Sequence, residues 1–223
     1  MIAVIVAMSV ELNLLLNILE NPEERTIDGY TFYVGTIGGK DVVAMQCGIG
    51  KVNAAVGTLT LINEFHPSLV INSGVAGGTG QGAEILDVVL GKQIAYHDVW
   101  CGPGTEWGMV QGMPEKFECP FDADAVAAKI GAKAGLIASG DFFVSKPEEV
   151  ERILSIHPDA IAVDMESASI AHTCHLKGVP MVALRVLSDT PGKADNAAQY
   201  TNFWDLAPKH TFEAVKGLLQ EVQ

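Results

Sequence analysis

Apolar residues in this chain occur in short continuous runs, and between the runs they recur at helical spacing. The first run, residues 1–8, is almost entirely apolar and predicts a buried strand. Ser9, a residue type that often caps helices, comes next, and leucines at positions 12, 15, 16 and 19 form one apolar stripe behind it. Asn21-Pro22 is expected to end that helix. The opening segment therefore predicts a strand and then a helix, with Glu11 in the first helical turn.

A β-hairpin and a second helix are predicted next. Residues 30–37 and 41–47 have the composition of two extended segments, and Gly38-Gly39-Lys40 between them supplies the turn. Gly48-Ile49-Gly50-Lys51 then opens a helix that runs to about Phe65. The glycines lack the spacing of a phosphate-binding P-loop, and no Ser or Thr follows the lysine. Tight packing of strand against helix explains these glycines as well as a bound phosphate would.

The middle of the chain predicts three more strands and a long loop. Residues 68–73 form an apolar core strand, and the Gly74-Val75-Ala76-Gly77-Gly78 segment after it would let a ligand approach the backbone closely. Residues 85–89 and 92–96 are expected to be two further strands. The loop from Trp100 to Phe117, called the 100–117 loop below, is rich in Gly and Pro. Loops of that length are usually functional or mobile.

The stretch of residues 160–189 predicts a strand, a helix and a second strand. Residues 160–163 are an apolar run, and residues 167–177 carry small and apolar side chains at helical spacing before a glycine stop. Residues 179–187 are almost continuously apolar, which is typical of a strand that is covered on both faces. The stretch therefore has the order expected of a strand–helix–strand unit in an α/β fold.

Two carboxylates stand at the ends of this unit. Glu166 lies where a strand becomes a helix, and Asp189 lies just past a strand. Strand ends are where open α/β sheets bind their ligands, so both residues are candidates for a site. Taken singly, Glu166 would also be explained as a helix cap and Asp189 as the start of a turn.

The remaining segments complete an alternation of strands and helices. A helix is expected after Pro120, a strand over residues 135–139, a helix from Lys146-Pro147, and a last helix from about Asn202 to Val222, after a Pro191-Gly192 loop. The predicted fold is a single α/β domain, residues 1–223, built as a three-layer α/β/α sandwich around a mixed, twisted sheet. The hairpin is what makes the sheet mixed rather than purely parallel.

Composition narrows the possible partners. A net charge of −13 argues against nucleic acid and against an anionic membrane as partner. The four cysteines form no CxxC pair and predict free thiols in a reducing cytoplasm. The opening apolar run is too short to span a bilayer and has no basic segment before it, so no signal peptide is expected. His172, Cys174 and His175 lie on one predicted helix without a carboxylate at ligand spacing, and we predict neither a metal nor a cofactor.

Two motifs carry a resemblance to a known family. Val163-Asp164-Met165-Glu166, followed by Arg185-Val186-Leu187-Ser188-Asp189, resembles the nucleoside phosphorylase/nucleosidase superfamily. Within it, the likeness is to the bacterial 5'-methylthioadenosine/S-adenosylhomocysteine nucleosidases, which also have a GIGK segment at the place of residues 48–51. The resemblance covers nearly the whole chain. It implies the nucleoside phosphorylase fold, a homodimer, and hydrolysis of the N-glycosidic bond of 5'-substituted adenosines.

The resemblance also implies a role for each charged residue of the motifs. Cleavage of this bond builds negative charge on adenine, so an acid near purine N7 is needed, and Asp189 matches that acid. Glu166 matches the residue that binds the ribose hydroxyls, in a segment where Asp164 and Met165 also line the substrate site and Met165 packs on the ribose. Glu11 matches the acid that, with Arg185, positions the attacking water.

Further positions follow from the same resemblance. Phe143 matches an aromatic residue that stacks on the purine, and Val144 matches the residue whose backbone bonds the purine edge. Val75 stands where the family commonly has a serine. This chain therefore lacks one hydroxyl near the proposed base and water.

The 5' end of the substrate is where this chain departs most from the family. In the family, the loop that follows a His-Asp segment, here His97-Asp98, crosses the dimer interface and lines an apolar 5' pocket, and the resemblance places Trp107 near that pocket. Its lining positions correspond to Pro103, Thr105 and Gln111, and Thr105 and Gln111 make the mouth more polar than is usual in the family. Tyr200 and Phe203 are expected to close over the pocket from the C-terminal side.

Three alternatives remain open from the sequence. A phosphorolytic relative is disfavoured because a carboxylate at Glu11 repels phosphate and suits water. A hydrolase for another nucleoside, such as futalosine, would share every core residue. A non-catalytic nucleoside-binding protein would keep Phe143 and Glu166 but has no need of Glu11 and Asp189 together.

Overall fold

The strands form one mixed sheet that is closed at one end. The computed structural model describes residues 1–191, 196–203 and 207–222, and in these ranges ten strands hydrogen-bond in the order β10-β6-β8-β9-β5-β1-β4-β3-β2, with β7 beside β6. An additional pairing of β10 with β5 closes five of the strands into a ring. The strands are β1 (Ile2–Val6), β2 (Glu20–Ile27), β3 (Tyr30–Ile37), β4 (Lys40–Gln46), β5 (Leu69–Gly78), β6 (Val88–Tyr96), β7 (Phe117–Glu118), β8 (Lys133–Ser139), β9 (Ala160–Asp164) and β10 (Met181–Asp189).

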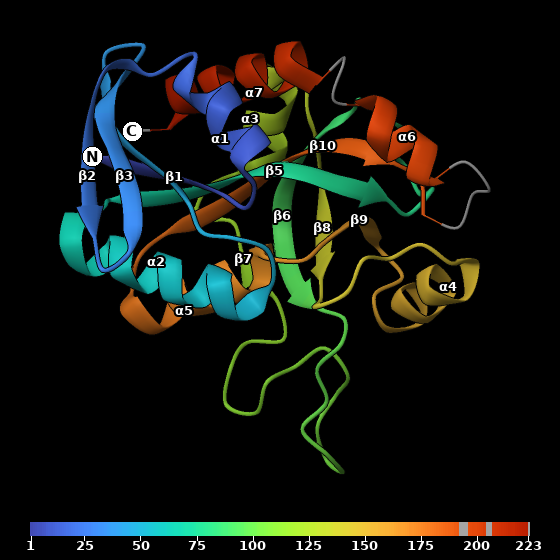
Figure 1. Ribbon diagram of the computed structural model, residues 1–223. Helices are drawn as coiled ribbons and strands as arrows, with labels where there is room; N and C mark the ends of the chain where they lie inside the picture. The colour runs from blue at the N-terminus through green and yellow to red at the C-terminus, as the bar shows by residue number, and fades with distance from the viewer. Residues whose placement is uncertain (192–195, 204–206, 223) are drawn as a thin grey trace.

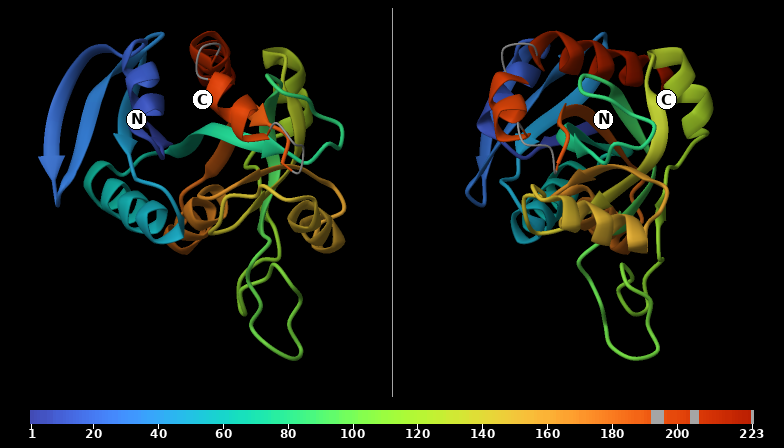
Figure 2. Two further views of the ribbon diagram at one scale, coloured as in Figure 1. Left: turned by 45° about the vertical axis from the view of Figure 1, so that its right-hand side comes forward. Right: turned by 90° about the vertical axis from the view of Figure 1, so that its right-hand side faces the viewer.

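Helices lie on both sides of this sheet (Figures 1 and 2). Helices α2 and α5 lie side by side on one side, and α1, α3 and α7 lie on the other. The helices are α1 (Ser9–Leu16), α2 (Lys51–Phe65), α3 (Ala123–Ile130), α4 (Pro147–Ile156), α5 (Ser167–Lys177), α6 (Asn196–Phe203) and α7 (Ala207–Glu221). No helix in the described ranges is long and apolar enough to cross a membrane.

The predicted mixed sheet is confirmed. Strand β1 pairs in parallel with β4 and β5, whereas the hairpin strands β3 and β4 are antiparallel. All residues of β1 and of β10 are buried, as their continuous apolar runs predicted. Apolar side chains fill a core on each side of the sheet, with Leu61 of α2 and Ile170 of α5 on one side and Leu15 of α1 and Leu218 of α7 on the other. The closure of five strands into a ring was not part of the prediction.

The first helix is shorter than predicted. Helix α1 ends at Leu16, its N-cap is Met8 and not Ser9, and Leu19 is buried beyond the helix end. Asn21-Pro22, expected to end the helix, instead lies inside β2, where the register shifts and Asn21 has a φ of 50°. Because β2 is the edge strand, its proline interrupts no ladder between two neighbours, and an edge strand tolerates it.

Three other boundaries differ from the prediction. The glycine-rich segment of residues 74–78, expected to follow the core strand, is instead the second half of β5, because it pairs with both β10 and β9. Residues 85–89 and 92–96 are not two strands; β6 is one strand with an irregularity between Gly91 and Gln93. The predicted last helix from Asn202 is two helices, since Asn202 belongs to α6 and α7 begins at Ala207. Gly192 of the predicted Pro191-Gly192 loop lies outside the described residues.

Candidate active site

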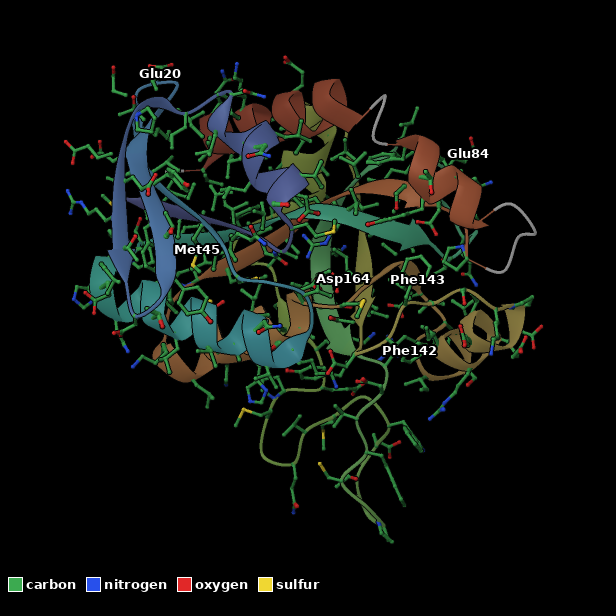
Figure 3. All side chains as sticks on the ribbon, in the orientation of Figure 1. Glu20, Met45, Glu84, Phe142, Phe143 and Asp164 are labelled. Atoms are coloured by element: carbon green, nitrogen blue, oxygen red, sulfur yellow. The ribbon has the colours of Figure 1, made fainter. Side chains whose placement is uncertain are left out.

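A pocket of about 130 Å³ opens at the carboxyl ends of β1, β9 and β10, beside the second half of β5. Figure 3 shows Asp164, Phe142 and Phe143 in this part of the molecule. Most of the residues predicted for the site line this one pocket, although they come from six separate stretches of the chain. They are Glu11, Val75, Phe143, Val144, Asp164, Met165, Glu166, Asp189 and Tyr200.

Glu11 is fixed by the backbone around it. Its Oε2 accepts hydrogen bonds from the N–H of Ala7 at 3.0 Å and of Met8 at 2.9 Å, and its Oε1 accepts one from Val75 N–H at 3.1 Å. Gly74 is required beside it, because a Cβ there would lie 2.7 Å from Oε1. Burial raises the pKa of Glu11 above its ordinary value, although the three N–H donors and the charge of Arg185 oppose that shift. A carboxylate has about four lone-pair positions, so one remains for a ligand in the pocket.

Arg185 lies beneath the pocket and does not line it. Its side chain is 1% exposed and makes five contacts, as many as a guanidinium has N–H donors. Two go to Oδ2 of Asp164, at 2.9 Å from Nε and 2.7 Å from the terminal nitrogen. The others go to the carbonyl oxygens of Asn72 and Leu184 and to the side-chain oxygen of Asn72. Arg185 therefore acts on the pocket through its charge, with its donors already used by the protein.

Asp164 is also held by the protein. Its second oxygen, Oδ1, accepts from the N–H of Ser167 at 3.2 Å and from the Ser167 hydroxyl at 2.9 Å, at the start of α5. Asp164 thus joins the end of β9, the start of α5 and the Arg185 side chain. It lines the pocket, but both of its oxygens are engaged away from a substrate.

Glu166 differs from Asp164 because, within the described residues, its carboxylate accepts a single hydrogen bond from the protein. Its Oε1 accepts from Gly50 N–H at 2.9 Å, across 116 residues of sequence. Burial, and then repulsion from Asp164, raise the pKa of Glu166 to about 7. The remaining acceptor positions of this carboxylate face the pocket that it lines.

Asp189 is aimed by an irregularity in its strand. Along β10, Leu187 pairs with Ala76 and Asp189 with the next residue, Gly77, so Ser188 is an extra residue in the ladder. Such bulges re-aim side chains next to active sites. The Ser188 hydroxyl lies 2.5 Å from Asp189 Oδ1 and 3.2 Å from the Ala76 carbonyl oxygen.

The apolar side of the pocket is built from five segments of the chain. Phe143 is 50% exposed, and its ring packs edge-on against Tyr200 with centroids 5.7 Å apart. The Tyr200 hydroxyl lies 3.5 Å from the sulfur of Met8. Ile49 of the GIGK segment also lines the pocket, together with Met165. Flat apolar side chains around a group of carboxylates suit a molecule with one aromatic part and one polar part.

Two predicted residues besides Arg185 do not line the pocket. Phe203 is buried against Val186 and does not line the pocket, so among the α6 side chains that the structure describes only Tyr200 lines it. Trp107 is 43% exposed and stacks on Trp100, with centroids 5.5 Å apart, while Arg152 lies over its ring. The 100–117 loop projects from the body of the molecule (Figure 1), and none of its residues lines the pocket of its own chain in the described structure.

Several site residues were not predicted. Asn72, Phe142, Ile49 and Ser188 all lie in or directly beneath the site. Ser188 and Phe142 adjoin predicted residues in sequence, which was the only available signal. Asn72 gave none, because an isolated polar residue in an apolar strand does not disclose its partner. Within the described residues, no group of three or more His, Cys, Asp or Glu side chains is arranged to hold a metal ion.

Comparison with known proteins agrees with this geometry. The family model described as the phosphorylase superfamily matches residues 1–220, and the chain belongs to that superfamily. The 5'-methylthioadenosine/S-adenosylhomocysteine nucleosidase of Actinobacillus succinogenes is 37% identical over 229 residues, which cover 100% of this chain and 99% of that protein. The crystal structure of the Neisseria meningitidis nucleosidase of the same name, in complex with methylthio-immucillin-A, superimposes with a TM-score of 0.92 at 35% identity, covering 99% of each chain. The resemblance predicted from the motifs is confirmed.

A second activity is represented among the similar structures. The futalosine hydrolase of Helicobacter pylori superimposes with a TM-score of 0.90 at 28% identity, covering 99% of this chain and 97% of that one. The backbone is thus nearly as similar to a hydrolase of another nucleoside, and only the side chains around the substrate can distinguish the two.

Proposed function

We propose that this protein hydrolyses the N-glycosidic bond of 5'-methylthioadenosine and S-adenosylhomocysteine, releasing adenine and a 5-substituted thioribose. The observation that carries the proposal is the placing of two acids, Glu11 and Asp189, in one pocket at the ends of β1 and β10. One carboxyl group is needed to protonate the leaving purine, and a second is needed to take a proton from the incoming water. The relatives that are 37% and 35% identical to this chain over nearly their full lengths carry the name of this activity.

The leaving group is the task of Asp189. As the C1'–N9 bond breaks, its electron pair moves onto adenine, and Asp189 donates a proton to N7. Phe143 stacks on the purine, and the backbone of Val144 bonds the purine edge. The Ser188 hydroxyl at 2.5 Å holds the Asp189 carboxyl in place.

The ribose and the water are the tasks of Glu166 and Glu11. Glu166 accepts hydrogen bonds from the ribose hydroxyls, and its negative charge faces the sugar as positive charge develops there. Met165 packs on the ribose. Glu11 takes a proton from the water as its oxygen bonds to C1', and burial, which raises the pKa of Glu11, makes it a better base. Arg185 serves as a positioning residue: it holds Asp164 and supplies a positive charge near Glu11.

Hydrolysis is favoured over phosphorolysis by the groups around the nucleophile. Phosphate requires cationic side chains or free N–H groups. Here the N–H groups of Ala7, Met8 and Val75 already bind Glu11, and the guanidinium of Arg185 has its donors occupied. The lysine of the GIGK segment is 2.7 Å from Asp98 and gives no support to a phosphate site.

We further infer a homodimer in which the 100–117 loop lies near the partner's active site. Apolar side chains are exposed along one side of α2, with Val52 73% and Val56 49% exposed, and Leu176 of α5 is 64% exposed. Helices α2 and α5 are neighbours, so these side chains form a surface that a second copy would cover. The same proposal includes a three-layer sandwich, a cytoplasmic location and a place in methionine salvage.

The deciding experiment is an adenine-release assay over a panel of 5'-substituted adenosines, with and without phosphate. We expect 5'-methylthioadenosine and S-adenosylhomocysteine to be cleaved at rates that do not depend on phosphate. The polar Thr105 and Gln111 should make the preference for the methylthio group smaller than an apolar mouth would, since burying an unpaired polar group costs about 1–3 kcal/mol. An exclusive preference for the methylthio compound would contradict the polar mouth. Futalosine is tested separately by release of its own base, hypoxanthine, and its cleavage without cleavage of either adenosine would select the second activity.

A further inference from the structure

A small ionic network lies at the carboxyl ends of β6 and β8, next to the pocket but outside the proposed chemistry. Lys51 Nζ is 2.7 Å from Asp98 Oδ1, and the other oxygen of Asp98 accepts from Asp141 N–H at 2.7 Å. Asp141 Oδ1 in turn accepts from the backbone N–H of Lys51 at 3.1 Å. The three residues thus form a closed ring of contacts between the start of α2 and the segments that follow β6 and β8. Figure 1 shows these three ends side by side.

Two members of the network adjoin residues that line the pocket. Gly50, directly before Lys51, donates its N–H to Glu166 Oε1 at 2.9 Å. Phe143, two residues after Asp141, forms the aromatic wall. The network therefore connects the backbone that holds the ribose-side carboxylate with the backbone that holds the base-side ring.

The contacts are partly shielded from water. The side chains of Lys51 and Asp98 are 24% and 19% exposed, whereas those of the surface pair Lys92–Asp124 are 52% and 65% exposed. Shielded ion pairs are screened less by solvent and salt than exposed ones. Lys51 Nζ also lies 5.2 Å from the centre of the Tyr96 ring.

The backbone is adapted to this arrangement. Gly50 has a φ of 88°, and a Cβ at this position would lie 2.7 Å from Asp141 Oδ1. A side chain at residue 50 would therefore disturb both the network and the hydrogen bond to Glu166. The Ser169 hydroxyl also donates to the Lys51 carbonyl oxygen at 2.6 Å, which fixes the same turn to α5.

We propose that Lys51, Asp98 and Asp141 are positioning residues that hold the Glu166 and Phe143 sides of the pocket at a fixed separation, so that one nucleoside's ribose and base are bound together. This gives the GIGK lysine a role without phosphate. The identity of the nucleoside rests on the function proposed above.

The test uses substitutions on each side of the network. Lys51→Met removes the ion pair next to Gly50, Lys51→Arg keeps it, and Lys92→Met is a matched control at the exposed pair. The readouts are kcat/KM for 5'-methylthioadenosine, kcat/KM for its 2'-deoxy analogue, and the Kd of adenine. Because small displacements at an active site cost up to about 100-fold in rate, we expect Lys51→Met to lower kcat/KM by about 10- to 100-fold. Lys51→Met should also lower the ratio of kcat/KM for 5'-methylthioadenosine to kcat/KM for its 2'-deoxy analogue. Lys51→Arg should restore most of the rate and most of this ratio.

The base side is tested by Asp98→Asn. Asp98 accepts from Lys51 Nζ with one oxygen and from Asp141 N–H with the other, whereas an asparagine side chain has only one oxygen. We therefore expect the Phe143 segment to loosen and the Kd of adenine to rise about tenfold. Asp141→Ala is a second variant at an exposed residue, for the case that Asp98→Asn fails to fold. Lys92→Met should leave all three readouts unchanged.

Three results would overturn the proposal. One is an equal loss of kcat/KM for the ribose and 2'-deoxyribose substrates in Lys51→Met, and another is an unchanged adenine Kd in a folded Asp98→Asn or Asp141→Ala. The third is a wild-type protein that binds no adenine, which would contradict both proposals. A wild-type protein that binds adenine but cleaves neither substrate would contradict only the proposed function, and the adenine measurements would still decide the role of the network.

Discussion

The strand ends around the pocket and the 100–117 loop hold their side chains in opposite ways. Glu11 accepts three backbone N–H groups, and Arg185 uses all its donors on Asp164, Asn72 and Leu184. In the loop, Trp107 stacks on another exposed tryptophan, and the Thr105 hydroxyl donates to the carbonyl of Gly102, three residues before it.

This difference indicates that the strand ends and the 100–117 loop have separate roles. Groups that move protons need fixed positions, and a closed ring of strands supplies many backbone groups to hold them. A loop that projects from the body of the molecule can change its side chains without disturbing the sheet. We therefore expect substitutions at the strand ends to act on bond cleavage, and substitutions in the loop to act on which 5' group is preferred.

The largest effect is expected from Asp189→Asn. The amide cannot protonate N7, and general acid help is worth about 100- to 10,000-fold, so kcat should fall by that factor. The fold should survive, since the asparagine oxygen can still accept from the Ser188 hydroxyl. Adenine release and thermal unfolding measure the two effects, and Trp107→Ala is the loop counterpart, expected to change KM more than kcat. Near wild-type turnover by Asp189→Asn would remove Asp189 from the mechanism.

Glu11→Gln should lower kcat far more than it weakens binding of a non-cleavable adenosine analogue, because Glu11 acts on the water. One N–H that now bonds to a carboxylate oxygen would face an amide NH₂ group, which should also cost about 1–3 kcal/mol of stability. Steady-state kinetics, analogue titration and denaturant unfolding separate these effects. Equal losses in kcat and in binding would instead make Glu11 a substrate-binding residue.

Glu166→Gln should change the pH dependence of both activity and stability. With a pKa of about 7, Glu166 becomes ionised as pH rises through 7, so wild-type kcat/KM should rise there, and the glutamine variant should lack that rise. The folded state holds this proton more tightly than the unfolded state, whose pKa is near 4.5, so wild-type stability falls as pH rises between those values.

The Glu166→Gln substitution removes this loss of stability, which reaches on the order of 3 kcal/mol once the pH is above the pKa of the folded state. The variant should therefore match wild-type stability below pH 4 and exceed it at pH 8. Unfolding curves at the two pH values measure this, and a variant that is less stable than wild type at pH 8 would show that the ionised carboxylate is well compensated.

The smallest effect is expected from Val75→Ser. A hydroxyl here could add one hydrogen bond near the base or water, worth only about 1 kcal/mol, and the valine's contact with the apolar cluster around Phe203 would be lost. Activity should stay within about fivefold of wild type. Severe inactivation would show that the site has repacked around the valine and that the roles assigned to its neighbours are wrong.

Elements with a strong local pattern were predictable from the sequence. The hairpin β3–β4, helix α2 and the strand–helix–strand unit from β9 to β10 lie where apolar spacing and turn residues place them. Glu166 and Asp189 were found as candidates because they follow apolar runs, and strand ends converge in an α/β fold. Each of these signals is contained within 30 consecutive residues.

Tertiary structure decided the features that depend on distant partners. Residues 74–78 became strand because β9 and β10 pair with them, and Asn21-Pro22 was accommodated because β2 is at an edge. Asp164 turned toward Arg185, Asn72 completed the partners of that guanidinium, and Phe203 packed beneath the pocket rather than over it. Local spacing fixes which residues can form a strand or helix, but a buried charge must find its compensating groups wherever the fold brings them, and those groups lie up to 116 residues away along the chain.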